Sequence, residues 1–279
     1  IINKISKPIS VEISLFNKFF NKTLESDVKL INYVINYIVK LKGKQLRPIL
    51  SILCSKLHNE KSSKKTYLSA SIVEILHVAT LLHDDVVDES DFRRGWPTIH
   101  KVWKNKLSIL VGDYMFSKAL INTSALNDLT SIQELSLLSK RLSEGEILQI
   151  EKAYKNSMTE EIYFKMISDK TASLISASCY LGYRSVNSDN NLADAIKKFG
   201  EFLGICYQLK DDLFDITGNI NDLGKPSSLD IKKNILTLPY IYILESLSNQ
   251  EKKKMLVKLN NHAKKRDITN LKKIIIDKG

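Results

Sequence analysis

Apolar residues recur at helical spacing, one, three and four residues apart, along almost the whole chain. Between Leu30 and Val39 the pattern is regular, and Gly43 follows it as a residue typical of a helix end. Similar patterns predict helices over residues 10–21, 46–58, 65–88, 107–121, 131–153, 159–183, 191–216 and 235–248, with weaker ones beyond 250. No stretch alternates apolar and polar residues long enough to predict a strand. We therefore expect one all-α domain over residues 1–279, with about ten or more helices around a central cavity.

The composition agrees with this expectation. Hydrophobic residues make up 43% of the chain and charged residues 26%, which is ordinary for a globular protein and excludes disorder and collagen. Ten glycines and five prolines are few for 279 residues, as expected for long helices. Pro48 and Pro239 can open helices, whereas Pro97 and Pro226 are expected in loops.

The cysteines and the chain start favour the cytoplasm. Cys54, Cys179 and Cys206 are scattered among apolar residues, and no Cys/His cluster has the spacing of a zinc site. No apolar run approaches the roughly 18 residues of a membrane span, and the start Ile1–Lys4 is not a signal peptide.

The net charge of +11 is concentrated near the end of the chain. Residues 251–279 carry ten Lys/Arg and three Asp/Glu, a pattern typical of a solvated helix face. Exposed aromatics interleaved with these charges would indicate nucleic-acid binding, but there are none, so we expect no nucleic-acid partner. Peripheral contact with a membrane surface stays open.

The strongest chemical signal is the run H-D-D-V-V-D near the end of a predicted helix. Asp84 and Asp88 lie about 40° apart on one helix face, where their charges repel unless a cation lies between them. A second copy, K-D-D-L-F-D, occurs 127 residues later and places Gln208, Asp211 and Asp215 on one face. Carboxylate oxygens suit Mg²⁺, which usually completes its octahedron with water and substrate phosphate. Two such motifs therefore predict a magnesium diphosphate site.

Basic residues that could complete such a site follow in a fixed order: Lys44 and Arg47 at a helix start, Arg93 and Arg94 after the first motif, Lys170 beside Thr171, and Lys225 after the second motif. With the aspartate motifs, this order from about Lys42 to Pro239 resembles the trans-prenyltransferases, the (all-E) polyprenyl diphosphate synthases. It is most similar to the bacterial medium- and long-chain enzymes. The resemblance implies the isoprenoid synthase fold, a homodimer, and head-to-tail condensation of isopentenyl diphosphate with an allylic diphosphate.

The resemblance also implies a role for each motif residue. The isopentenyl diphosphate would be bound by Lys44, Arg47, His77 and Arg94. Three Mg²⁺ would be bound by Asp84 and Asp88, with Asp85 in support, and by Asp211, with Asp212 and Asp215 helping. The allylic diphosphate would be bound by Arg93, Lys170 and Lys225, with Thr171 and Gln208 facing the developing carbocation. No side chain is an obvious general base, and we expect His83 to pack between helices.

The chain also departs from the family pattern. Tyr207 stands where the family usually has Phe, and Asn234 and Ile235 stand where it often has Gly and Lys. The loss of that Lys puts one allylic contact in doubt. The chain ends at Gly279 within a helical pattern, which leaves open whether a terminal helix is missing.

Two alternatives belong to other classes. A class I terpene cyclase would carry an Asn/Asp, Ser/Thr and Glu motif where this chain has Asp211, Asp212 and Asp215. A non-catalytic or regulatory subunit of a heteromeric prenyltransferase would usually lack aspartates from one motif, whereas both are complete here.

The product length is expected to depend on residues just before the first motif. Ala79 and Thr80 lie about 6–8 Å before Asp84 along the helix, where short-chain family members carry bulky aromatics. Two small residues predict an open tunnel and a product of C20 or longer, with C30–C40 expected.

Overall fold

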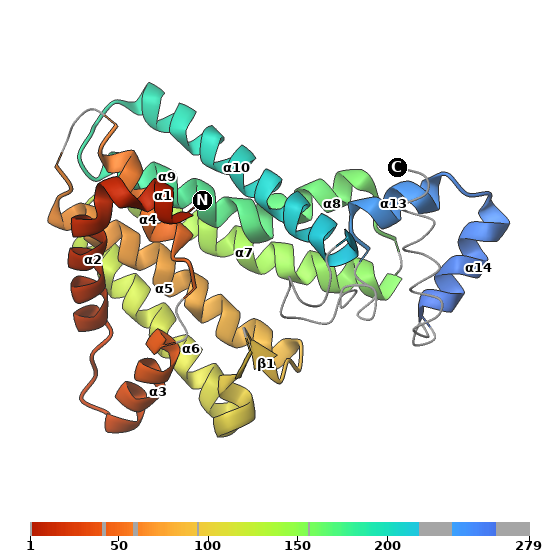
Figure 1. The fold of residues 1–279 in the computed structure, drawn as a ribbon, viewed down its shortest axis with the longest axis horizontal. Coiled ribbons are helices and arrows are strands. Elements are labelled where there is room, and N and C mark those ends of the chain that lie inside the picture. Colours follow the sequence, from red (N-terminus) through yellow and green to blue (C-terminus); the bar gives the residue numbers. More distant parts are fainter. Residues whose placement is uncertain are drawn as a thin grey trace. The chain divides into compact units, whose positions relative to one another are not determined.

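The computed structural model describes residues 2–40, 43–57, 61–93, 95–155, 157–217 and 236–260 (Figure 1). Contacts within the chain define two compact units, Ile1–Ser139 with Leu174–Glu201, and Lys140–Ser173 with Phe202–Gly279, called here the first and the second unit. The elements are α1 (Ile2–Ser6), the 3₁₀ turn η1 (Lys7–Ile9), α2 (Ser10–Thr23), α3 (Lys29–Lys40), α4 (Leu46–Ser55), α5 (Lys64–Val87), β1 (Phe92–Arg93), β2 (Trp96–Pro97), α6 (Ile99–Ala125), α7 (Leu129–Lys155), α8 (Glu160–Ile167), the π turn η2 (Ser168–Ala172), α9 (Ser173–Arg184), α10 (Asn190–Thr217), α13 (Leu238–Glu245) and α14 (Asn249–Asn260).

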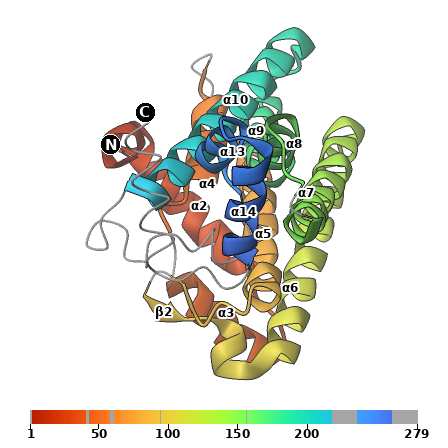
Figure 2. The ribbon, with the colours of Figure 1, turned by 90° about the vertical axis from the view of Figure 1, so that its right-hand side faces the viewer.

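Helix α5 is the central helix of the first unit. It begins with a capping box, in which the Ser63 hydroxyl accepts the Thr66 N–H and the Thr66 hydroxyl accepts the Ser63 N–H. Its middle turns, with Ile72, Val73 and Ile75, are fully buried. Helix α6 runs alongside it in both views (Figures 1 and 2). Such burial holds the C-terminal end of α5, which carries the first aspartate motif, in a fixed position.

A short hairpin follows α5. Phe92 pairs with Pro97 and Arg93 pairs with Trp96 in an antiparallel register. Gly95 in the turn has φ +79°, a conformation that glycine adopts at no steric cost. These two-residue strands are too short to leave an alternating pattern in the sequence. The hairpin brings the Arg93 side chain back to the end of α5, where it contacts Asp85.

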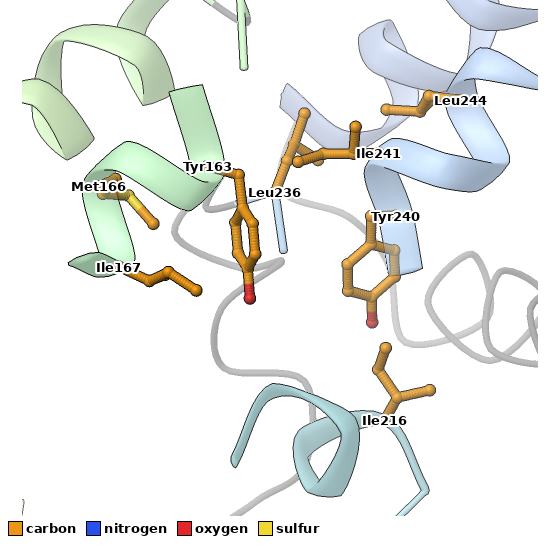
Figure 3. Packing of buried hydrophobic residues seen from close by; sticks show 8 residues of the cluster. All are labelled: Tyr163, Met166, Ile167, Ile216, Leu236, Tyr240, Ile241 and Leu244. Atoms are coloured by element: carbon orange, nitrogen blue, oxygen red, sulfur yellow. The ribbon is translucent and has the colours of Figure 1, made fainter. Parts of the chain in front are cut away.

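The second unit has its own hydrophobic core. It is formed by Tyr163, Met166, Ile167, Ile216, Leu236, Tyr240, Ile241 and Leu244, which come from α8, the end of α10, and α13 with the residues before it (Figure 3). Pro239 lies in the first turn of α13, as expected. Pro226 lies outside the described residues.

The all-α expectation is confirmed, and the observed helices match most predicted ranges. Most boundaries agree within three residues, and two larger differences stand out. Helix α6 begins at Ile99 rather than near 107, because a kink at Lys104 (φ 72°) breaks its periodicity. The predicted helix 159–183 is interrupted by η2. The single-domain expectation stays a prediction. Within the described ranges, no helix is both long and apolar enough to cross a membrane.

Candidate functional site

The first aspartate motif lies at the C-terminal end of α5. The Asp88 N–H donates to the Asp84 carbonyl at 2.8 Å, so helical hydrogen bonding continues as far as Asp88. Asp84 and Asp88 are therefore one turn apart on the same face, and both are partly exposed. Two carboxylates at this spacing at a helix surface form a set of oxygen donors suited to a hard cation.

The middle aspartate of this motif points elsewhere. Asp85 is only 4% exposed, and Arg93 from the hairpin forks onto it. Arg93 Nε donates to both oxygens, at 2.9 Å to Oδ1 and 3.1 Å to Oδ2, and Arg93 Nη2 donates to Oδ1 at 2.7 Å. A bidentate Arg–carboxylate pair fixes the guanidinium plane. Asp85 thus positions Arg93, the residue for which the family resemblance implies a role at the allylic diphosphate.

Neighbouring residues of α5 have distinct environments. The His83 ring lies over Gly112 of α6, with Nε2 at 3.3 Å from the Ile109 carbonyl, which confirms that His83 packs between helices. His77 is partly exposed, and its carbonyl accepts the Thr80 hydroxyl at 2.9 Å. Ala79 is 1% exposed.

The basic residues at the start of α4 are also placed. Gln45, the N-cap residue, has a left-handed backbone with φ 49°. Lys44 is exposed, and Arg47 is partly buried in the first turn. Both belong to the first unit together with His77 and the first motif. Arg94 lies outside the described residues.

The second motif lies near the end of α10, in the second unit. Asp211 is exposed and Asp215 is partly exposed, whereas Asp212 is 4% exposed. Tyr163 Oη donates to Asp212 Oδ2 at 2.5 Å, and Gln208 Nε2 donates to Asp212 Oδ1 at 2.7 Å. Burial raises the pKa of Asp212 above its ordinary value, and these two hydrogen bonds oppose that effect. Asp212 thus connects the second motif on α10 to Tyr163 of α8.

The same hydrogen-bond chain reaches the predicted catalytic residues. Thr171 Oγ1 donates to Gln208 Oε1 at 2.8 Å, so Tyr163, Asp212, Gln208 and Thr171 form one connected network. Because the Thr171 proton is committed to Gln208, the remaining lone pairs of the Thr171 oxygen are available to a positive centre.

Lys170 is held by α7. Its Nζ lies 2.5 Å from Glu146 Oε2 and 3.1 Å from Gln149 Oε1. Glu146 and Gln149 are three residues apart on one face of α7, so both can reach the Lys170 ammonium. Gln149 is 9% exposed. These two contacts direct the Lys170 ammonium toward α7. Lys225, Asn234 and Ile235 lie outside the described residues.

Sequence reasoning missed Tyr163, Glu146 and Gln149. Tyr163 is apolar in a periodicity count, and nothing local shows that its hydroxyl meets Asp212, 49 residues away. The run E-G-E-I-L-Q does contain a signal, because a glycine in a helix beside two hydrogen-bonding side chains indicates close packing at that point.

The donor set fits Mg²⁺ in its chemistry. The outer aspartates of each motif present oxygen ligands at one helix surface, while the middle ones are used internally. No cluster of three or more His, Cys, Asp or Glu residues is close enough to hold a metal among the described residues. Magnesium commonly takes one or two carboxylates and completes its shell with water and phosphate, which agrees with this arrangement.

Comparison with known proteins gives the family. Residues 28–276 match the model of the polyprenyl synthetase family. A prenyl transferase of Cyanophora paradoxa is 34% identical over 88% of this chain and 77% of its own length. Component 2 of the heptaprenyl diphosphate synthase of Geobacillus stearothermophilus is 34% identical over 72% of this chain and 63% of its own length. The chain therefore belongs to the polyprenyl synthetase family. This confirms the resemblance that the aspartate motifs and basic residues indicated.

Two solved structures agree with this result. The decaprenyl diphosphate synthase of Rhodobacter capsulatus has a TM-score of 0.91 and 29% identity, and the match covers 99% of this chain and 85% of that one. A polyprenyl synthase of Caulobacter crescentus, solved with calcium and isoprenyl diphosphate, has a TM-score of 0.90 and 28% identity over 99% of this chain and 84% of its own.

Proposed function

We propose that the chain is a trans-polyprenyl diphosphate synthase that condenses isopentenyl diphosphate with an allylic diphosphate, head to tail. The observation that carries the proposal is the shared design of the two aspartate motifs. In each, the outer aspartates lie at a helix surface and the middle aspartate is buried at 4% exposure and hydrogen-bonded by the protein. Such paired carboxylates suit a polyphosphate that is bound through metal ions.

We assign three Mg²⁺ to the motifs, two to Asp84 and Asp88 and a third to Asp211, with Asp215 in support. When bound, Mg²⁺ would neutralise charge on the departing diphosphate. The burial and hydrogen bonds of Asp85 and Asp212 favour positioning roles for these two, in place of direct ligation.

The basic residues divide between the two substrates. We assign Lys44, Arg47, His77 and Arg94 to isopentenyl diphosphate, and Arg93, Lys170 and Lys225 to the allylic diphosphate. Arg93 and Lys170 are directed by Asp85 and Glu146 respectively, so their charges are already oriented before an anion arrives. The oxygens of Thr171 and Gln208 would stabilise the developing allylic cation.

The product is proposed to be C20 or longer, with C30–C40 expected. Small residues at Ala79 and Thr80 support a long product, since neither has a ring that could close a tunnel along α5. Among the relatives, a nonaprenyl diphosphate synthase of Rhodobacter capsulatus and a geranylgeranyl diphosphate synthase of Saccharolobus solfataricus span this range in their names.

A homodimer is proposed as the active form. Helix α6 exposes an apolar stripe formed by Ile109, Leu110, Phe116, Leu120 and Ile121, with exposed fractions from 37% to 62%. Within it, Ile109, Phe116 and Leu120 are spaced by seven and four residues, so they lie on one face that a second copy could cover. The cytoplasm is proposed as the compartment, which agrees with free thiols at Cys54, Cys179 and Cys206.

A second candidate function is that of one subunit in a two-protein synthase. It is favoured by the relative from Geobacillus stearothermophilus, whose name identifies it as component 2 of a heptaprenyl diphosphate synthase. In that case the α6 stripe would be covered by a different protein.

An assay on the purified chain, which measures incorporation of labelled isopentenyl diphosphate into lipid product, decides between these candidates. Incubation with farnesyl diphosphate and Mg²⁺ is expected to give a labelled polyprenyl product, and EDTA is expected to abolish it. Incorporation only after addition of a second protein would support the two-protein candidate. No incorporation with any allylic primer, by a folded dimer, would contradict the proposed function.

A further inference from the structure

Lys170 and Thr171 lie in the π turn η2, where the backbone departs from the α-helix. The Ser173 N–H donates to the Ser168 carbonyl, five residues earlier. In a regular α-helix that N–H would instead bond to the Asp169 carbonyl. Single π turns are rare in proteins overall, but those that occur are often found at functional sites. The wider turn redirects the side chains that follow it.

The chain compensates for the widened turn locally. The Ser173 hydroxyl donates to the Asp169 carbonyl at 2.5 Å, and so supplies the hydrogen bond that the Ser173 N–H no longer makes. The flanking helices also approach closely. A Cβ on Gly145 of α7 would lie 2.9 Å from the backbone nitrogen of Lys170, and one on Gly204 of α10 would overlap Ala172. The π turn is thus enclosed on two sides.

A charged link joins the turn to α7. Arg141 Nε donates to Asp169 Oδ1 at 2.7 Å, and Arg141 Nη2 donates to Ser168 Oγ at 2.8 Å. The Asp169 side chain is 9% exposed and that of Arg141 is 25% exposed. Lys165 also contacts Asp169, at 2.9 Å from Oδ2, but it lies on α8, one turn before Asp169, and is 66% exposed.

These contacts follow one face of α7. Arg141 binds the first two residues of the turn, Gly145 lies against its backbone, and Glu146 and Gln149 receive the Lys170 ammonium. We infer that Arg141 is a positioning residue for the proposed reaction: its fork to Ser168 and Asp169 holds the π turn in the geometry that presents Lys170 and Thr171 to the allylic diphosphate. This inference rests on the proposed function.

The two cations on Asp169 differ in what they can position. Lys165 and Asp169 belong to one continuous helical segment, so their ion pair cannot fix that segment against a neighbour. Its lysine side chain is also 66% exposed, and a solvated ammonium on a flexible stem restrains its partner little. Arg141 connects two segments and binds two adjacent residues with a planar fork, which restrains rotation of the turn as well as distance.

The test compares Arg141→Met with Lys165→Met, which removes the other cation from Asp169 and is the matched control. Arg141→Met is expected to lower kcat/KM for the allylic diphosphate by roughly a hundredfold, because small misplacements of reacting groups have effects of that size. The KM for isopentenyl diphosphate should change less than threefold, and Lys165→Met should resemble the wild type. Equal effects of both variants, or an equal effect of Arg141→Met on both substrates, would overturn the inference.

Hydrogen exchange gives a readout that does not depend on turnover. The amides of residues 170–173 should exchange at least tenfold faster in Arg141→Met and at the wild-type rate in Lys165→Met. Unchanged exchange in Arg141→Met would overturn the inference. If Arg141→Met does not fold, Asp169→Asn, which keeps the side-chain shape and removes its charge, replaces it in both measurements. Failure of the proposed function would show instead as an inactive wild type with the predicted exchange difference intact.

Discussion

At the scale of single residues, the outer and the middle aspartates of each motif lie in different environments. The outer residues lie at helix surfaces, whereas Asp85 and Asp212 are each 4% exposed and fully engaged with protein donors. In both residues each carboxylate oxygen already accepts a hydrogen bond from the protein, and burial leaves little access for a cation. The middle aspartates therefore fix the helix ends from which the outer ones project.

Removal of an outer aspartate should abolish catalysis without unfolding the chain. Asp84→Ala or Asp211→Ala is expected to lower turnover by at least about three orders of magnitude, because charge stabilisation in the transition state contributes several kcal/mol. Asp194→Ala, an exposed aspartate earlier in α10, is the control and should keep wild-type turnover. Near-normal turnover of either motif variant, with an unchanged circular dichroism spectrum, would contradict the assignment.

Removal of the Tyr163 hydroxyl should mainly affect stability. Tyr163 is fully buried, and Tyr163→Phe leaves Asp212 Oδ2 without that donor, at a cost of about 1–3 kcal/mol in the free energy of unfolding. Tyr242→Phe, on a side chain 67% exposed in α13, should cost less than about 0.5 kcal/mol. Urea denaturation measures both, and equal costs would show that the Tyr163–Asp212 bond contributes nothing.

At the scale of elements, the π turn is the feature that periodicity alone could not reveal. Apolar spacing predicts a continuous helix over 159–183, and the residues within it are compatible with one. The turn forms where Arg141, Gly145 and Gly204 of other helices meet it. Its stability should therefore depend on the charge of Asp169.

This dependence predicts an acid-sensitive contribution. Burial acts to raise the pKa of Asp169, but hydrogen bonds from Lys165 and Arg141 hold it below the ordinary value. A lowered pKa stabilises the folded state above the ordinary carboxyl pKa of about 4, and that contribution is lost as the pH falls through the folded value. The melting temperature of the wild type should exceed that of Asp169→Asn by a constant amount between pH 5 and 7. The difference should shrink below about pH 4, and a difference that persists undiminished at acid pH would refute this.

At the scale of the whole molecule, the exposed stripe on α6 predicts self-association. Ile121→Lys places a charge within it and is expected to shift the chain toward the monomer in analytical ultracentrifugation, because an unpaired charge is costly in an apolar interface. Val11→Lys, at a similarly exposed apolar position on α2, should leave the association state unchanged. A monomeric wild type would contradict the homodimer.

Product length is a second property of the whole molecule. Ala79→Phe is expected to shorten the dominant product toward fifteen carbons, because the ring would fill the proposed tunnel along α5, five residues before the first aspartate of the motif. Since Ala79 is 1% exposed, the variant should also melt at a lower temperature than the wild type.

Thr80→Phe, at a partly exposed position, should shorten the product with less loss of stability. Lys65→Phe, at the exposed start of the same helix, is the control. Chromatography of the dephosphorylated products decides it, and an unshifted product from an active Ala79→Phe would refute the tunnel argument.

The sequence by itself determined the helical class, the two motifs and the placement of their outer aspartates on one helix face. These depend on periodicity and on spacing along one helix, which are local properties of the chain. Only the tertiary structure decided that Arg93 forks onto Asp85, that Tyr163 anchors Asp212 from 49 residues away, and that Arg141 meets a π turn 28 residues later. Those contacts depend on where helices cross, and a crossing is set by the packing of many side chains together rather than by the pattern within any one segment.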